Sequence, residues 1–109
     1  MTDQAVVRVL AALAQASRLQ IFRQLVVAGP AGMTPTQLST LLSMQATALS
    51  FHLKELHRAG LLASRQEGRS IIYMAQFETM NALLGYLTEN CCGGNPCSPV
   101  SRCSTTSES

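Results

Sequence analysis

The stretch Thr34–Met74, TPTQLSTLLSMQATALSFHLKELHRAGLLASRQEGRSIIYM, decides the fold of this chain. It begins with Thr34-Pro35-Thr36-Gln37, a capping-box pattern with proline at the first helical position, which predicts a short helix running through about Leu42. A connection of about three residues around Ser43 separates this helix from a second one. Two short helices joined in this way are typical of a helix-turn-helix.

The second helix has two different faces. Leucines recur at helical spacing along one face, which predicts burial of Leu49, Leu53 and Leu56. The other face carries small, hydroxyl-bearing and basic side chains and one phenyl ring, at Thr47, Ala48, Ser50, Phe51, Lys54 and Arg58, with Glu55 beside them. Serine, threonine and lysine can reach base edges in a major groove, and alanine or phenylalanine can touch a thymine methyl group. Taken by itself, this face also fits an ordinary solvated helix surface.

A β-hairpin is predicted directly after this helix. Gly60 ends the helix, and two strands, Leu61–Gln66 and Ser70–Met74, are joined by Glu67-Gly68-Arg69. The expected fold is therefore mainly α with a β-hairpin wing, an α+β winged helix-turn-helix.

The charge of this region supports contact with nucleic acid. Arg65 and Arg69 lie near the predicted hairpin tip, where a wing meets the phosphate backbone. The whole chain has a formal net charge of only +2. We therefore expect affinity to come from a dimer that presents two such surfaces rather than from one charge-rich module.

Three strings of the chain resemble the ArsR/SmtB family of winged-helix repressors: ASRLQIFRQL, LSFHLKELHRAGLL and SRQEGRSIIYMA. The resemblance covers about Val6 to Asn90, and its most specific part is the S-x-H-L-x-x-L-x-x-x-G-L pattern from Ser50 to Leu61. It implies a homodimer that occupies an operator and lets go when a metal or metalloid binds.

The 109 residues are expected to form one domain over residues 1–90 and a flexible cysteine-rich tail over residues 91–109. Helical stripes are predicted near both ends of the domain, in Gln4–Ala14 and Phe77–Asn90. As in the family, we expect these two helices to dimerise the protein, although the first also fits the core of a monomer. A zinc site of Asp, His and Glu on the last helix is rejected, because only Glu78 and Glu89 occur there.

The region between Ala14 and the helix-turn-helix is interpreted as scaffold. Ser17 is the predicted N-cap of a helix that ends at the breaker cluster Gly29-Pro30-Ala31-Gly32. Its expected buried positions are Leu19, Phe22, Leu25 and Val26. Arg18 could fold back to pair with a carboxylate, and no function is assigned to it. His52, farther on, is expected to be half-buried and hydrogen-bonded, and His57 to be solvated.

All four cysteines fall in CCGGNPCSPVSRC, at Cys91, Cys92, Cys97 and Cys103. A redox disulfide and a zinc site are possible readings, although a cytosolic chain is kept reduced and no C-x-x-C knuckle is present. A trivalent metalloid, As(III) or Sb(III), is favoured, since soft thiolates select soft acceptors and a pyramidal centre needs three sulfurs. The expected ligands are Cys91, Cys92 and Cys97, with Cys103 as an uncertain fourth.

The sequence thus predicts a metalloid-responsive repressor of double-stranded operator DNA, with no catalytic residue or cofactor. The family's best-known arsenic site, a C-x-C pair, is replaced here by Gln37, Leu38 and Ser39. Close alternatives are a sensor of trivalent organoarsenicals and a thiol-redox switch, and a more distant one is a zinc-storing module that docks a protein. A cytoplasmic protein with no membrane contact is expected, because there is no long apolar run and no basic signal start.

Overall fold

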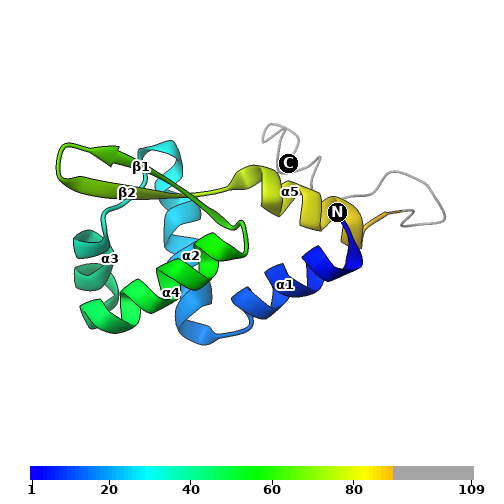
Figure 1. The fold of residues 1–109 in the computed structure, drawn as a ribbon, viewed down its shortest axis with the longest axis horizontal. Coiled ribbons are helices and arrows are strands. Elements are labelled where there is room, and N and C mark those ends of the chain that lie inside the picture. The colour runs from blue at the N-terminus through cyan, green and yellow to red at the C-terminus, as the bar shows by residue number, and fades with distance from the viewer. Residues whose placement is uncertain (90–109) are drawn as a thin grey trace. The chain divides into compact units, whose positions relative to one another are not determined.

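A computed structural model describes residues 1–89, which divide into two units. One unit is Thr2–Gln76, and the other comprises Met1 and the residues from Phe77 onward. The elements of the first unit, Thr2–Gln76, are α1 (Asp3–Leu13), α2 (Ala16–Ala28), the 3-10 turn η1 (Gly29–Ala31), α3 (Pro35–Leu42), α4 (Ala46–Arg58), β1 (Leu62–Glu67) and β2 (Ser70–Ala75) (Figure 1). Helix α5 (Phe77–Leu87) belongs to the second unit and is described by itself. The predicted winged helix-turn-helix, with helices and a two-stranded antiparallel hairpin, is confirmed.

The helix-turn-helix begins as predicted. The Thr34 hydroxyl accepts a hydrogen bond from the Gln37 backbone N–H at 3.1 Å, and the Gln37 side chain accepts one from the Thr34 N–H at 2.9 Å. This reciprocal capping box, with Pro35 in the first turn, satisfies two of the helix's free N–H groups. In the turn that follows, Ser43 has a left-handed backbone conformation (φ 53°). The Ser39 hydroxyl donates a hydrogen bond to the Met44 carbonyl oxygen, and the Met44 N–H donates one to the Ser39 carbonyl oxygen.

The end of α4 is a Schellman motif centred on Gly60. The Gly60 N–H donates to the His57 carbonyl at 3.0 Å, and the Leu61 N–H donates to the Leu56 carbonyl at 3.0 Å. Gly60 has φ 83°, a left-handed conformation that glycine adopts without a side-chain clash. Leu56 and Leu61 are both fully buried, so the apolar contact of this motif directs the chain from α4 into the hairpin.

The hairpin has a two-residue loop, Gly68-Arg69, and not the predicted three-residue connection. The strands pair from Leu62 with Ala75 to Glu67 with Ser70, so the first strand is shifted by one residue from the prediction, and the second begins at Ser70 as predicted and is one residue longer. Gly68 has φ 62° at the first loop position, where a type II′ turn places glycine.

A short third strand segment, which the sequence did not predict, extends the hairpin. Met33 and Tyr73 exchange two backbone hydrogen bonds of 2.9 Å in an antiparallel bridge. Gly32 makes this approach possible, since a Cβ atom there would lie 2.5 Å from the Tyr73 carbonyl oxygen. The wing is therefore tied to the chain that follows α2.

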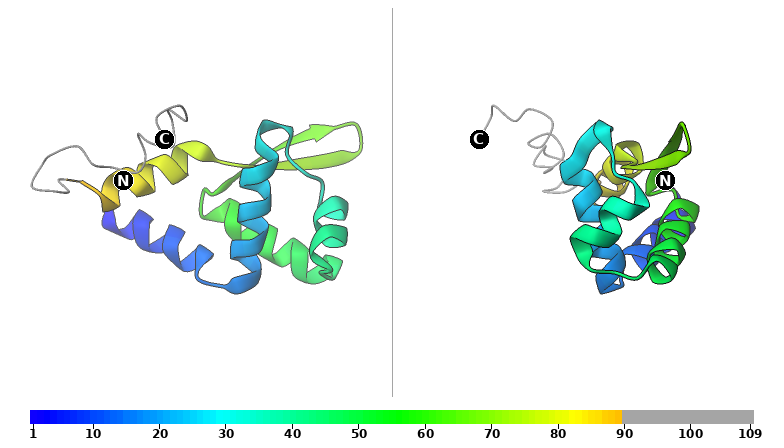
Figure 2. Two further views of the ribbon diagram at one scale, coloured as in Figure 1. Left: turned by 180° about the vertical axis from the view of Figure 1, so that it is seen from behind. Right: turned by 90° about the vertical axis from the view of Figure 1, so that its left-hand side faces the viewer.

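Helix α2 lies at the centre of the first unit, and three expectations about it are wrong. It packs against α1, α3, α4 and β2, and Figure 2 (left) shows it with α3 beside it and α4 behind. Its N-cap is Gln15, whose side chain accepts from the Arg18 N–H at 2.9 Å, rather than Ser17. Leu19 is 43% exposed, and Ile21 is fully buried in its place, together with the correctly predicted Phe22 and Leu25. Val26, also expected to be buried, is half-buried.

Helix α1 buries Val6 and Val9 and leaves Leu10 and Val7 exposed. Arg18 joins α1 to α2, but its Nε donates to the Ala12 carbonyl oxygen at 3.0 Å and not to a carboxylate. A carbonyl near the end of a helix has no partner within that helix, so a cation there is favourable.

Helix α5 ends at Leu87, before the predicted limit of Asn90. Leu83 is buried, while Phe77 and Leu87 are exposed. The pairing of α1 with α5 across a dimer axis remains a prediction.

No single helix of residues 1–89 is long and apolar enough to cross a membrane. Helix α1, together with α2 and η1 up to Ala31, has enough length and apolar composition for a span, but the two segments are bent by 98° relative to each other.

Candidate nucleic-acid interface

Helix α4 separates into the two faces that its sequence predicts. Leu49, Leu53 and Leu56 are buried, and the five positions predicted to contact DNA are all exposed: Thr47, Ala48, Ser50, Phe51 and Lys54. The Phe51 side chain is 56% exposed, and its ring meets the edge of the His52 ring with a centroid distance of 5.7 Å. A large aromatic group held on a polar surface is suited to an apolar contact such as a thymine methyl group.

A groove of about 510 Å³ lies between α4 and the hairpin. Its walls combine polar and basic side chains of the helix with side chains of both strands: Ser50, Lys54, His57, Arg58, Ser64, Ile71 and Tyr73. The three strand residues were not predicted from the sequence. Ser64 and Tyr73 are direct cross-strand partners, and Ile71 lies two residues from Tyr73 on the same face. The alternation of side chains along the strands was the signal that would have found them.

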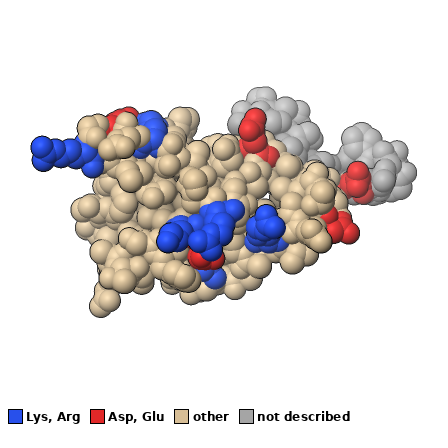
Figure 3. All heavy atoms as spheres, viewed as in Figure 1, with Lys and Arg blue, Asp and Glu red and all other residues tan. Residues whose placement is uncertain are grey.

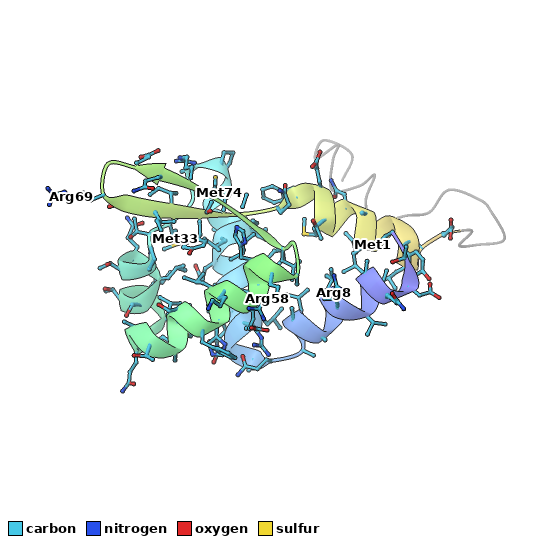
Figure 4. The ribbon with its side chains drawn as sticks, viewed as in Figure 1. Met1, Arg8, Met33, Arg58, Arg69 and Met74 are labelled. Atoms are coloured by element: carbon cyan, nitrogen blue, oxygen red, sulfur yellow. The ribbon has the colours of Figure 1, made fainter. Side chains whose placement is uncertain are left out.

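The loop of the hairpin presents one cation away from the rest of the unit. Figure 4 shows Arg69 extending beyond the end of the ribbon. Neither Arg69 nor Lys54 forms an ion pair with another residue of the described part of the chain. Both charges are therefore available to an external anion.

Arg65, the other predicted wing contact, is occupied by internal partners. Its guanidinium group donates to the Glu67 carboxylate at 2.7 Å and to the carbonyl oxygens of Pro30 at 3.0 Å and Ala31 at 3.2 Å. The side chain is 41% exposed, so part of it still faces solvent. The two carbonyl contacts attach β1 to η1, the turn that follows α2. Contact of Arg65 with DNA remains a prediction, with Arg69 the better placed of the two.

His52 departs in part from its prediction. It is half-buried as expected, but its Nδ1 atom is buried and has no hydrogen-bond partner among the described residues. Burial lowers the pKa of His52, and the positive charge of Arg18 lowers it further. The neutral form of His52 is therefore favoured in the folded protein, where this α4 side chain is subject to the charge of Arg18 on α2. His57 is exposed, as predicted.

Lys and Arg side chains lie close together near the middle of the view in Figure 3. Arg58 at the end of α4 pairs with Glu55 at 3.3 Å, and the Arg58 side chain is mostly exposed. An exposed pair one helical turn apart contributes little to stability, so an external anion can compete for Arg58.

The candidate inducer ligands Cys91, Cys92, Cys97 and Cys103 lie outside the described residues. Within residues 1–89, no three His, Asp or Glu side chains form a cluster that could hold a metal ion. The described region therefore bears on DNA recognition, and the assignment of the inducer site rests on the sequence alone.

Comparison with known proteins agrees with this geometry. A helix-turn-helix domain family (HTH_20) matches residues 13–65. No curated protein matches the chain. Among solved structures, an ArsR-like transcriptional regulator from Rhodococcus sp. RHA1 is similar with a TM-score of 0.71 and 26% identity, over 96% of this chain and 91% of that one.

Two further structures are similar over most of their length. HlyU from Vibrio cholerae has 30% identity and a TM-score of 0.66, over 84% of this chain and 99% of that one. A homodimeric winged helix-turn-helix DNA-binding domain from Mycobacterium bovis, described as a possible ArsR-family regulator, has 26% identity and a TM-score of 0.65, over 83% of this chain and 89% of that one. With its exposed α4 face and its wing, the chain belongs to the ArsR/SmtB family of winged helix-turn-helix transcriptional regulators, which bind DNA and are not enzymes.

Proposed function

We propose that this protein is a metalloid-responsive repressor of an arsenic-resistance operon. As an apo homodimer in the cytoplasm, it occupies operator DNA, and it releases the DNA when As(III) or Sb(III) binds. The observation that carries the proposal is the set of four cysteines in CCGGNPCSPVSRC, which follows the DNA-binding and dimerisation domain of residues 1–90 within a short tail, residues 91–109.

The ligands in this proposal are the thiolates of Cys91, Cys92 and Cys97, with Cys103 as a candidate fourth. Soft thiolates select soft acceptors. Arsenite condenses with three thiols, forming three As–S bonds and releasing water, to give a neutral product. A neutral centre can be buried near an apolar dimer interface at little electrostatic cost. The glycine pair Gly93-Gly94 allows the chain to turn so that Cys97 reaches the adjacent pair.

The DNA contacts follow from the exposed side of α4. Ser50 and Lys54 reach base edges in the major groove, with Thr47, Ala48 and Phe51 around them. Arg69, with Arg65 in a lesser part, contacts the phosphate backbone from the wing. These positions are exposed in the described unit, which supports the assignment.

Dimerisation through α1 and α5 completes the proposal. The similar domain from Mycobacterium bovis is a homodimer. On α1, Val7 and Leu10 are exposed apolar residues that a partner would cover. For strong induction, the metalloid must bind the DNA-free form more tightly than the DNA-bound form by about 3 to 5 kcal/mol.

The pair Cys91-Cys92 favours a second candidate ligand class. Trivalent methylated or aromatic arsenicals offer only two exchangeable positions, so two adjacent thiolates are enough to hold them.

The test is DNA binding to the upstream region of the protein's own gene, with and without arsenite. Cys91→Ser, Cys92→Ser and Cys97→Ser should each bind DNA normally and fail to release it, whereas Cys103→Ser should still respond. If Cys97→Ser responds and Cys103→Ser does not, the third ligand is misassigned. Normal release from all four variants would remove the thiol site from the mechanism, and release of Cys97→Ser by phenylarsenite but not by arsenite would favour the two-thiol class.

A further inference from the structure

A second hollow, of about 320 Å³, lies on the side of α4 that faces α1 and α2. Arginines from all three helices line it: Arg8 of α1, Arg18 of α2 and Arg58 of α4. The remaining lining is Glu55 and small alanines of α1 and of the end of α4. Three guanidinium groups and one carboxylate therefore surround a single open space.

The charges in this hollow are not balanced by the protein. Glu55 lies 3.3 Å from Arg58 and offsets one of the three cations. Arg18 is held by the Ala12 carbonyl through its Nε atom, an interaction that leaves its charge in place. Arg8 has neither a hydrogen bond nor an ion pair within the described part of the chain. Two uncompensated positive charges remain, and an anion in the hollow would lower their mutual repulsion.

The hollow adjoins the groove between α4 and the hairpin, because Arg58 lines both. Figure 4 shows Arg58 and Arg8 on neighbouring helices, and Figure 3 shows Lys and Arg side chains gathered on the same face. The positive surface thus runs from Lys54 past Arg58 onto α1, beyond the residues expected to contact DNA.

The length of α4 indicates which anion binds to the positive surface at Arg58 and Arg8. Ser50 and Arg58 are eight residues apart, which is about 12 Å along a helix. The major groove is also about 12 Å wide, and phosphates line its edges. A helix that places Ser50 and Lys54 over the bases therefore brings Arg58, and Arg8 beside it, to the phosphates at one edge. Guanidinium groups match phosphate oxygens in bidentate geometry.

We propose that Arg8, Arg18 and Arg58 form a phosphate-binding site, and that its occupant is a backbone phosphate of the bound DNA. This inference rests on DNA binding by the family and not on the response to metalloid. It assigns to α1 a direct part in holding DNA, in addition to its proposed part in the dimer.

The test compares Arg8→Gln with Arg23→Gln. Both residues are exposed, and both variants remove one positive charge, but Arg23 lines a separate hollow with Leu19 and Val27. Arg8→Gln should weaken binding to operator and to unrelated duplex by the same factor. It should lower the slope of log affinity against log salt by about 0.9 for each phosphate that is no longer neutralised, which is about a threefold change in the ratio of affinities between about 50 and about 200 mM salt.

Arg23→Gln should keep the wild-type slope, and Arg8→Lys should recover most of it because the charge is restored. Equal slopes for Arg8→Gln and Arg23→Gln would overturn the proposal, as would a weakening confined to the operator. Failure of the wild type to bind any duplex would overturn it together with the repressor function. A normal arsenite response with an unchanged Arg8→Gln slope would overturn the phosphate site alone.

A second arm separates DNA phosphate from free phosphate. Wild-type protein without DNA is titrated with inorganic phosphate at constant ionic strength, and the backbone amide signals of α1 and α4 are followed by NMR. Saturable shifts that Arg8→Gln abolishes, with no effect of that variant on DNA binding, would make free phosphate the occupant and overturn the assignment to DNA. Absence of saturable shifts, together with the altered salt slope, is the result we expect.

Discussion

Helices α2 and α4 are both 13 residues long, and each packs against at least four other elements, but more of the surface of α4 is exposed. Helix α2 packs against α1, α3, α4 and β2, and a hydrogen bond from the Arg18 side chain attaches its first turn to α1. Helix α4 is held through one leucine face and through its glycine-containing end. Its other face is exposed, including Phe51.

This difference separates stability from recognition. Side chains on the free face of α4 can change with little effect on the fold, because they touch few other groups. Changes in α2 or at its ends affect several neighbours at once. We expect the fold to be sensitive at α2 and DNA binding to be sensitive at α4.

The largest expected effect follows from truncating a core side chain of α2. Leu25→Ala removes most of a fully buried side chain and should lower the free energy of unfolding by about 2 to 5 kcal/mol. Lys54→Ala, on the exposed face of α4, should change it by less than about 0.5 kcal/mol. Urea denaturation followed by circular dichroism measures both. Comparable decreases in the two variants would contradict the division between the helices.

The next effect tests how the end of α2 is tied to the wing. Gly29 and Gly32 have the same kind of backbone, with φ 68° and ψ −151° and φ 66° and ψ −171°, so alanine at either position costs about 1 to 3 kcal/mol in backbone strain. At Gly32 the new Cβ would also collide with the backbone of Tyr73, whereas at Gly29 nothing lies within 4 Å. Gly32→Ala should therefore be the more destabilising variant in thermal unfolding. Equal midpoints would show that the close approach to β2 is not maintained.

A smaller effect is expected from pH where α4 meets α2. Because the pKa of His52 is lowered in the folded protein, the neutral form is favoured there, while the unfolded chain takes up a proton near pH 6.5. Stability should therefore fall as the pH drops below about 6.5, and the fall should end below the folded-state pKa. His52→Gln should remove this part of the pH dependence of unfolding. The matched variant at the exposed His57, His57→Gln, should retain it; the reverse pattern would refute the assignment to His52.

The sequence predicted the helix-turn-helix and the hairpin well, since short-range chemistry encodes their limits. The capping box at Thr34, the Schellman glycine Gly60 and the turn glycine Gly68 each act within a few residues. Burial of the leucine face of α4 was also predicted correctly. The opposite face is polar, so the helical period of the sequence allows only the leucine face to be buried.

Two errors were local, the N-cap of α2 and the length of the hairpin loop, and the others arose where distant segments meet. Helix α2 has apolar residues on several sides, so its period did not distinguish Leu19 from Ile21 as the buried position. Arg65 reaches Pro30 across 35 residues, and the bridge from Met33 to Tyr73 joins segments that are also far apart in the chain, so no local pattern indicated either interaction. The same holds for the strand side of the groove, whose residues reach α4 only after the hairpin folds.

The central claim is that the exposed face of α4, and not the general positive charge of the protein, holds the operator. The most direct measurement is operator affinity, by fluorescence anisotropy at one salt concentration, for Lys54→Gln and Arg23→Gln. Each variant removes one exposed positive charge, one on α4 and one on α2. Lys54→Gln should weaken operator binding by about 1 to 3 kcal/mol if Lys54 contacts a base, while Arg23→Gln should leave it nearly unchanged. Equal weakening in the two variants would contradict the account.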